Sequence, residues 1–487
     1  MSGLDLVVAG GTVVTAADSF SADVGIRNGR IVQIGEGLQG ADRIDATGLL
    51  VLPGGIDAHV HLDQATSDRT VMADDFASGT RSAAAGGNTT VLPFAMQIKG
   101  QSLRACVEAY HRKAQGKCHT DVSFHLVVTD PTPQVLGQEL PALVRDGYTS
   151  FKVFMTYDDL VLDDAELLEV FEVARREQAL VMVHAEGHDA IKHLTRRLEE
   201  QGRTAPFYHG QAHAQIAERE ATHRAISHAQ LIDVPIVIVH VSGREPMEQI
   251  QWARARGLRV HAETCPQYIV LTADDLRGLN MDFEGAKYVC SPPPRDTDSQ
   301  AAIWQGLRDG TFDIFSSDHC PFRFCGPAET GKNNSRARTS FRWVPNGIPG
   351  VETRLPILFS EGVSKGRISL QRFVSLTATN PARLYGLYPE KGSIAIGADA
   401  DLTLWDPKLT RSIRQDTLNH GCDYTPYEGL EITGWPVRTI LRGRTIAMNG
   451  RPEAKADGRY LPRRTSQAFQ GRPDTTAATG KGLATSR

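Results

Sequence analysis

Eight short apolar runs recur through the middle of the chain, and this repetition constrains the fold more than any other feature. They occupy residues 55–61, 89–94, 121–128, 149–155, 180–185, 235–241, 258–263 and 313–318. Stretches with helical periodicity lie between them, for example 163–178 and 217–230. Continuous Val and Ile runs bounded by polar loops are typical of parallel strands that are buried on both faces. About eight β–α units in succession predict an α/β fold, a TIM-type (β/α)8 barrel over residues 56–385.

Both ends of the chain differ from its middle. The segment LVVAGGTVVT is β-branched, and Asn28-Gly29 separates two apolar runs in the manner of a type I′ hairpin. Similar segments, GSIAIGADADLTLWD and VRTILRGRTIAMNG, return late in the chain. We therefore expect a smaller β-sandwich domain formed from residues 1–55 and 386–460. Residues 461–487 are poor in large apolar side chains, which predicts a tail that is disordered or orders against another subunit.

The composition argues against several classes of protein. Hydrophobic residues make up 41% of the 487 residues and charged residues 23%, a balance that suits a sizeable folded core. Fifty-three Lys and Arg oppose 57 Asp and Glu, and a net charge of −4 argues against a general nucleic-acid binder. No uninterrupted run of about 18 apolar residues is present, and the N-terminus lacks a secretory pattern. The seven cysteines form no C-x-x-C pair, so we expect reduced thiols in a cytoplasmic protein without membrane segments.

An H-x-H pair ends the first predicted barrel strand. Residues i and i+2 of a strand point to the same face, so His59 and His61 can reach one metal ion from one side. Taken alone, such a pair is more often two ordinary polar histidines. Four further predicted strands carry a residue of metal-binding type at or near their C-terminal ends, where barrel active sites lie. These residues are Lys152, His184, His240 and Asp318. Five strands that deliver such groups to one rim predict a metal site.

Lys152 has two interpretations. A charged lysine repels metal ions, but burial beside cations lowers the pKa of the amine and makes it nucleophilic. Reaction with CO₂ would then convert the amine to a carbamate, which resembles a bridging carboxylate. The other interpretation is an ion pair between Lys152 and Asp318. The sequence does not separate the two.

Taken together, the segments resemble the cyclic amidohydrolases of the amidohydrolase superfamily, in the dihydropyrimidinase/hydantoinase branch. They cover about residues 5–460 and form a highly specific combination. The segments that carry the resemblance are PGGIDAHVHLD, MADDFASGTRSAAAGGNTTV, GYTSFKVFMTY, VMVHAE, IVIVHVSG, HAETCPQYIVLT, KYVCSPPPR, SSDHCPF, PNGIPGVETR and TATNPARLYGLYPEKGSIAIGADADLTLWDP.

The resemblance implies hydrolysis of a ring C–N bond in a small cyclic amide or ureide, with a dihydropyrimidine or hydantoin opened to an N-carbamoyl amino acid. It implies two divalent metal ions, usually zinc, and a homotetramer or dimer. A bridging hydroxide would attack the ring. The implied metal ligands are His59, His61 and Asp318 for the first ion, His184 and His240 for the second, and N6-carboxylated Lys152 for both. The implied substrate-site residues are Asp318 as proton shuttle, Tyr157 at the oxyanion, and the backbones of Ser291 and Asn346 at the ring amide.

Three segments depart from the usual pattern of this branch. HAEGHD stands where HAENGD is common, and the loop LDQATSDRTVMADD is more polar than is typical of aryl-hydantoinases. The segment 322–344 is long and basic, with Arg323, Lys332, Arg336, Arg338 and Arg342. We favour a solvated loop for this segment. The alternative is a pocket that prefers small or polar, including anionic, ring substituents.

Other functions remain open at this point. An allantoinase or a cyclic imidase would share much of this ligand set. A non-enzymatic scaffold relative would lack metal ligands, whereas all six positions are filled here. A single-metal deaminase needs neither Lys152 nor Tyr157, and both are present.

Overall fold

The computed structural model describes residues 3–64, 66 and 70–470, and all eight predicted strand regions contribute to one parallel sheet. Its strands are β6 (Gly55–Val60), β7 (Asn88–Met96), β8 (Asp121–Val122), β9 (His125–Val127), β10 (Ser150–Phe154), β11 (Leu180–His184), β12 (Ile236–Ile238), β13 (Val260–Thr264) and β14 (Ile314–Phe315). A parallel bridge joins Val60, in β6, to His319, after β14. The sheet is therefore a nearly closed barrel, which confirms the predicted fold class.

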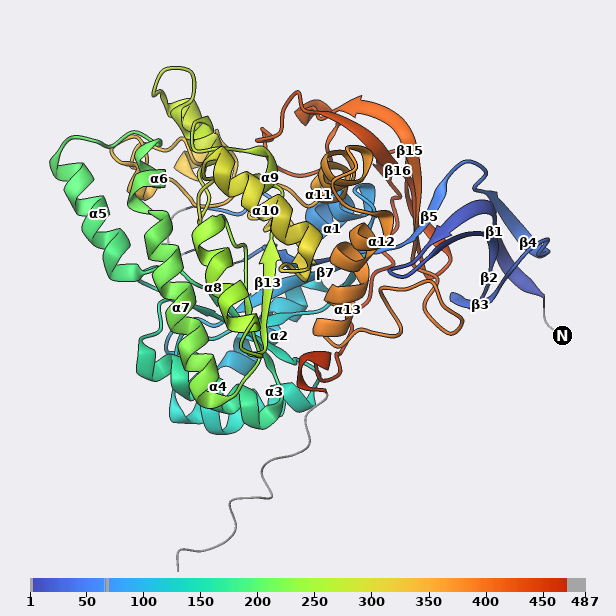
Figure 1. Ribbon diagram of the computed structural model, residues 1–487, viewed down its shortest axis with the longest axis horizontal. Coiled ribbons are helices and arrows are strands. Elements are labelled where there is room, and N and C mark those ends of the chain that lie inside the picture. Colours follow the sequence, from blue (N-terminus) through green and yellow to red (C-terminus); the bar gives the residue numbers. More distant parts are fainter. Residues whose placement is uncertain (1–2, 65, 67–69, 471–487) are drawn as a thin grey trace, which may run out of the picture.

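Helices alternate with these strands and cover the outside of the barrel (Figure 1). They are α1 (Phe76–Ala85), α2 (Leu103–Ala114), α3 (Leu140–Arg145), α4 (Asp164–Glu177), α5 (His188–Glu200), α6 (Tyr208–Ala212), α7 (Gln215–Ile232), α8 (Arg244–Arg254), α9 (Gln267–Val270), α10 (Thr297–Asp309), α11 (Arg354–Leu358), α12 (Leu370–Val374) and α13 (Asn380–Leu384). Capping residues in the sequence determine where helices begin. Before α4, for example, the Asp163 carboxylate accepts from the Glu166 amide at 2.8 Å, and the Glu166 carboxylate accepts from the Asp163 amide at 2.9 Å.

Alternation along the strands decides which side chains enter the barrel. In β10, Phe151 and Val153 belong to the large core cluster of the molecule. Phe154 belongs instead to a second cluster with Ile56, from β6. Since neighbours in a strand point to opposite faces, Lys152 shares the face of Phe154. This register places a lysine inside the barrel.

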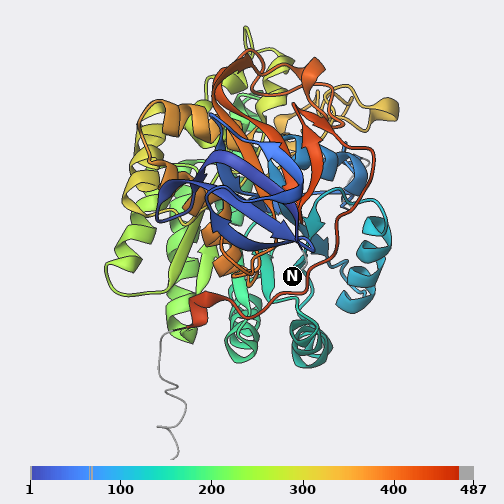
Figure 2. The same cartoon turned by 90° about the vertical axis from the view of Figure 1, so that its right-hand side faces the viewer.

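The two chain ends form one further nine-stranded sheet, as the sequence predicted. It contains β1 (Leu4–Val14), β2 (Ser19–Arg27), β3 (Arg30–Gly35), β4 (Gly40–Asp45), β5 (Leu50–Pro53), β15 (Leu402–Ser412), β16 (Glu431–Leu441), β17 (Arg444–Met448) and β18 (Arg451–Pro452). Strand β5 lies between β1 and β15, so the two ends of the chain join there. Figure 2 shows the blue N-terminal strands and the orange C-terminal strands side by side at the flank of the barrel.

The start of the predicted tail lies against this chain's own barrel. The Leu461 amide donates to the carbonyl of Val122 at 2.8 Å. The buried guanidinium of Arg463 donates to the hydroxyl of Ser150 at 2.8 Å. The remainder of the predicted tail, residues 471–487, lies outside the described residues. Within the described part of the chain, no helix combines the length and the apolar character needed to cross a bilayer.

Candidate metal centre and substrate pocket

All six predicted metal ligands lie at the C-terminal rim of the barrel. His59, Lys152 and His184 belong to β6, β10 and β11 themselves. His61, His240 and Asp318 follow the ends of β6, β12 and β14 within a few residues. Parallel strands end at the same edge of a barrel, so five separate strands bring these side chains together.

One group of three could hold a metal ion. Ligand atoms of His59, His61 and Asp318 lie within 4.8 Å of one another. The Oδ1 atom of Asp318 is 3.2 Å from Nε2 of His59 and 3.4 Å from Nε2 of His61. The amine of Lys152 is 3.5 Å from the same His59 nitrogen.

The other two histidines adjoin this group. The rings of His184 and His240 have centroids 4.4 Å apart, and the His240 ring is 5.4 Å from that of His59. Nδ1 of His240 is buried and has no hydrogen-bond partner among the described residues. A buried polar atom without a partner is costly unless an ion or water contacts it. The donor set of imidazoles and a carboxylate therefore fits the metal ions that the sequence predicts.

Neighbouring side chains fix which imidazole nitrogen faces the centre. Nδ1 of His59 lies 2.7 Å from a carboxylate oxygen of Glu263, and Nδ1 of His61 lies 2.6 Å from the amide oxygen of Gln64. In each ring the Nε2 atom is left on the side of Asp318. Ligating histidines are commonly oriented in this way by a second hydrogen bond.

The surroundings of Lys152 increase the fraction of its amine that is uncharged at neutral pH. The side chain is 1% exposed, and its Nζ atom lies between the rings of Phe94 and Phe154, at 5.2 and 5.1 Å from their centroids. Burial lowers the pKa of Lys152, and the charges of Glu263 and Asp318 oppose this only in part. Burial also raises the pKa of Glu263. An uncharged amine is the form that reacts with CO₂.

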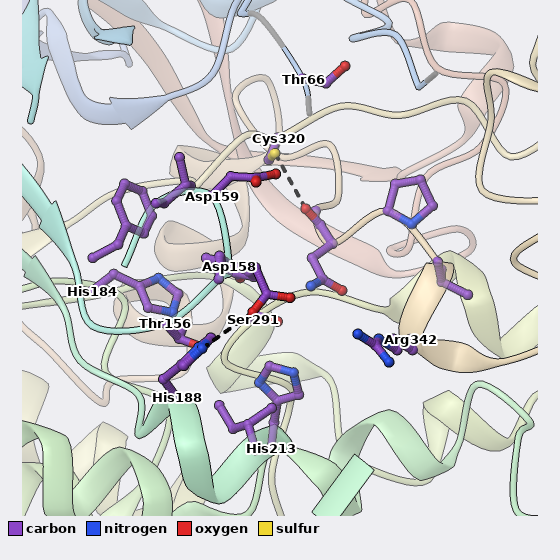
Figure 3. Close-up of a pocket in the computed structure, with 18 of the residues that line it drawn as sticks. Thr66, Thr156, Asp158, Asp159, His184, His188, His213, Ser291, Cys320 and Arg342 are labelled. Atoms are coloured by element: carbon purple, nitrogen blue, oxygen red, sulfur yellow. Dashed lines mark hydrogen bonds and ion pairs between the residues drawn. The ribbon is translucent and has the colours of Figure 1, made fainter. Parts of the chain in front are cut away.

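The rim opens into a cavity of about 1260 Å³ that also contains the predicted substrate contacts. Figure 3 shows part of its lining, including Ser291 and Arg342. The ring of Tyr157 lies 5.3 Å from that of His184, and burial raises the pKa of the tyrosine well above its usual range. Its hydroxyl therefore keeps its proton at neutral pH. Ser291 and Asn346 line the same cavity.

Three of the predicted residues have strained backbone. Tyr157, His240 and Asp318 have φ values of 73°, 38° and 48°, in the left-handed region that residues with side chains rarely adopt. Such strain persists only where the surrounding structure imposes it, and it concentrates at functional sites. The residue pattern gave no indication of this conformation.

The basic segment 322–344 has mixed surroundings. Arg336 and Arg342 are exposed and line the cavity, whereas Arg338 lies over the ring of Phe283 at 5.0 Å. Arg323 is exposed and does not line the cavity. Lys332 is fully buried, which corrects the interpretation of a uniformly solvated loop, because its amine finds backbone acceptors inside the protein.

The other two departures lie at the same cavity. In HAEGHD, the imidazole of His188 contacts the carboxylate of Asp158 at 3.4 Å (Figure 3). The polar loop 62–75 contributes Gln64, beside His61, but residues 65 and 67–69 lie outside the described residues.

The sequence analysis missed two carboxylates that hold the predicted ligands. Glu263 is in β13 and contacts His59, and Glu186 contacts His184 at 2.8 Å. Both had a signal. Glu263 stands near the C-terminal end of a predicted strand, as Asp318 does, and Glu186 follows His184 by two residues.

Comparison with known proteins agrees with the fold described above. The model of the amidohydrolase family matches residues 50–446. A D-hydantoinase from Rhizobium radiobacter is 44% identical over 464 residues, which cover 95% of this chain and 99% of the relative. A D-hydantoinase from Geobacillus stearothermophilus is 44% identical over 94% of this chain and 96% of the relative. The crystal structure of a dihydropyrimidinase from Brevibacillus agri superposes with a TM-score of 0.91 at 43% identity, and the match covers 96% of this chain and 99% of that chain.

Proposed function

The chain belongs to the amidohydrolase family, in the branch of the hydantoinases and dihydropyrimidinases, and from this premise we propose that it opens a dihydropyrimidine or hydantoin ring to an N-carbamoyl amino acid. The observation that carries the proposal is the convergence of six ligand-type side chains at one rim of a large cavity.

The proposed centre holds two divalent ions, with Zn²⁺ as the metal that suits nitrogen and carboxylate donors. His59, His61 and Asp318 would hold one ion and His184 and His240 the other, with N6-carboxylated Lys152 shared between them. When bound, the ions would lower the pKa of an attacking water and polarise the ring carbonyl.

The chain's own groups supply the remaining chemistry. The Asp318 carboxylate accepts a proton from the attacking water and delivers it to the ring nitrogen that leaves. The Tyr157 hydroxyl, protonated because burial raises its pKa, donates a hydrogen bond to the developing oxyanion. Backbone groups of Ser291 and Asn346 hold the ring amide and orient the scissile bond. We also propose a cytoplasmic location and a homotetramer or dimer. The mass of the native particle would test the oligomeric state.

The first test is a ring-opening assay of purified protein before and after chelation. The panel contains dihydrouracil, hydantoin, 5-phenylhydantoin, allantoin and succinimide. We expect chelator-sensitive turnover of dihydrouracil or hydantoin well above the others. Preferred turnover of allantoin or succinimide would move the assignment to an allantoinase or a cyclic imidase. Metal-free protein that cannot be reconstituted and opens no ring would overturn the proposal.

The role of Lys152 has a separate test. A Lys152→Ala variant should lose binding of two metal ions together with activity. Lys192→Ala is the matched control, because Lys192 lines the same cavity but pairs with Asp158 at 2.9 Å. If the Lys152 variant kept full activity and its metal content, the shared-ligand role would be wrong.

A further inference from the structure

A buried carboxylate bridges two histidines behind the proposed metal centre. Glu186 is fully buried, and its two oxygens face different rings. Oε2 lies 2.8 Å from Nε2 of His184, and Oε1 lies 2.8 Å from Nδ1 of His213. This is the one hydrogen bond that the described residues give to the ring of His184. A carboxylate accepts only, so each imidazole carries its proton on the side of Glu186.

This contact decides which atom of His184 is available to a metal. With Nε2 protonated and bound to Glu186, the lone pair of the neutral ring is on Nδ1. His59 and His61 have the opposite arrangement, because their Nδ1 atoms contact Glu263 and Gln64. His184 therefore presents a different nitrogen from His59 and His61, and a different carboxylate accepts from its ring.

The bridge continues into a buried polar network. The carbonyl of His213 accepts from the guanidinium of Arg295 at 2.5 Å. Arg295 also donates to the carboxylate of Glu218 at 2.8 Å and to the hydroxyl of Ser242 at 2.9 Å. Glu218 accepts from the backbone amide of Ser242 at 2.9 Å. Every residue of this network is at least nine-tenths buried. Buried polar groups whose hydrogen bonds are satisfied hold one another in place.

Ser242 follows His240 by two residues, which means that the network ends beside the other proposed ligand of the second ion. One connected set of hydrogen bonds thus supports both His184 and the loop after His240. Glu263 also reaches this side, because its carboxylate accepts from the backbone amide of His240 at 3.2 Å and its carbonyl accepts from the amide of Val241 at 2.8 Å. The support of the His59 and His61 rings does not pass through Glu186.

We propose that Glu186 is a positioning residue for the second metal ion, which fixes the ligand atom of His184 and ties it through His213 to the network behind His240. The inference rests on the proposed function, because it requires the two-metal centre. Loss of such an orienting partner lowers metal affinity by about 10- to 100-fold. The loss of affinity should be confined to the second of the two ions.

The experiment is a zinc titration of metal-stripped protein by calorimetry, with the metal content measured after dialysis. Wild type should bind two ions per chain. Glu186→Ala should retain one ion tightly and bind the second about 10- to 100-fold more weakly. Glu186→Gln keeps the shape of the side chain and can still accept one N–H, so its affinity for the second ion should fall between those of wild type and Glu186→Ala. His213→Gln tests the same bridge from its far end and should weaken the second site less than Glu186→Ala.

The matched control is Glu199→Gln. Glu199 lines the same cavity and accepts from the hydroxyl of Ser340 at 2.7 Å, and among the described residues it makes no contact with a proposed ligand. It should bind two ions like wild type. A folded Glu186→Gln or His213→Gln protein, verified by circular dichroism, gives the answer where Glu186→Ala does not fold.

The outcomes separate the inference from the proposed function. Two ions in wild type and unchanged affinities in every folded bridge variant would overturn the inference and leave the proposed function intact. Equal weakening of both sites would also overturn it, because the effect would not be specific to the second ion. A wild type that binds no metal would overturn the proposed function itself.

Discussion

Among single residues, Tyr157 allows the sharpest test of catalysis. Its raised pKa keeps the phenol protonated, so removal of the hydroxyl removes a hydrogen-bond donor. In Tyr157→Phe we expect kcat to fall about 100-fold with a smaller change in KM, because the hydrogen bond forms to charge that develops in the transition state. Steady-state kinetics and metal content measure this. A variant that lost metal instead would show that Tyr157 supports the fold of the centre.

Lys332 makes a pH-dependent contribution to stability. Its buried amine donates to the carbonyls of Ala286 and Val289 at 3.0 and 2.7 Å, and burial lowers its pKa to about 7 from 10.5. The unfolded chain therefore binds more protons between these values, so this residue makes the protein more stable as the pH rises from 7 towards 10, by at most about 1.4 kcal/mol per pH unit. It opposes folding most below pH 7.

The measurement is the difference in free energy of unfolding between wild type and Lys332→Met as a function of pH. We expect the wild type to gain on the variant as the pH rises. Lys365→Met serves as the control, because Lys365 is 53% exposed and pairs with Glu361, and its difference should stay flat over the same range. A flat curve for Lys332→Met would mean that the amine stays charged when buried.

At the scale of secondary-structure elements, the strands were predictable because each apolar run is a continuous segment of the sequence, and the order of these runs can be read along the chain. The same logic found His184 and Asp318, since each ends a strand. What holds them was not predictable: Glu186 meets His213 across 27 positions and Glu263 meets His59 across 204. Those partners are set by helix placement and barrel closure. The position of Lys332 escaped prediction for a related reason, because a basic run is usually solvated.

The segment 322–344 supplies a prediction about substrate preference. The guanidinium of Arg342 lies over the ring of Trp343 at 4.6 Å and lines the cavity. An acidic ring substituent would gain a charge-assisted contact there. Arg342→Gln should therefore lower kcat/KM for a 5-carboxyethylhydantoin about tenfold and leave unsubstituted hydantoin unchanged.

Arg338→Gln is the matched control, because Arg338 comes from the same segment and does not line the cavity. The Arg338 variant should leave kcat/KM unchanged for both substrates. Equal effects of the Arg342 variant on both substrates would argue against an acidic preference and for a general change in the pocket.

In the whole molecule, a buried cation joins the terminal sheet to the barrel. The amine of Lys391 lies 2.6 Å from carboxylate oxygens of both Asp121 and Asp401, and 3.0 Å from Asp399. Asp121 belongs to β8 of the barrel, whereas Asp401 immediately precedes β15 of the terminal sheet. The three carboxylates raise the pKa of Lys391 against the effect of burial, so the lysine is charged at neutral pH. The barrel is thus attached to the flanking sheet by charge as well as by packing.

Removal of this cation should lower the free energy of unfolding of the protein. Lys391→Met removes the cation that three carboxylates share, although Asp121 keeps its ion pair with Arg442. Breaking a buried ion pair from one side costs about 3–5 kcal/mol. Arg30→Gln is the control, because Arg30 contacts the same Asp399 at 3.5 Å from the surface, with 52% of its side chain exposed. Its loss should cost at most about 1 kcal/mol. Urea unfolding of both variants measures the difference. Similar small losses in the two variants would show that the contact between the barrel and the terminal sheet depends on apolar packing. A large loss confined to Lys391→Met would show that the buried ion cluster stabilises this contact. An unchanged kcat in the folded protein would show that the cluster does not contribute to catalysis.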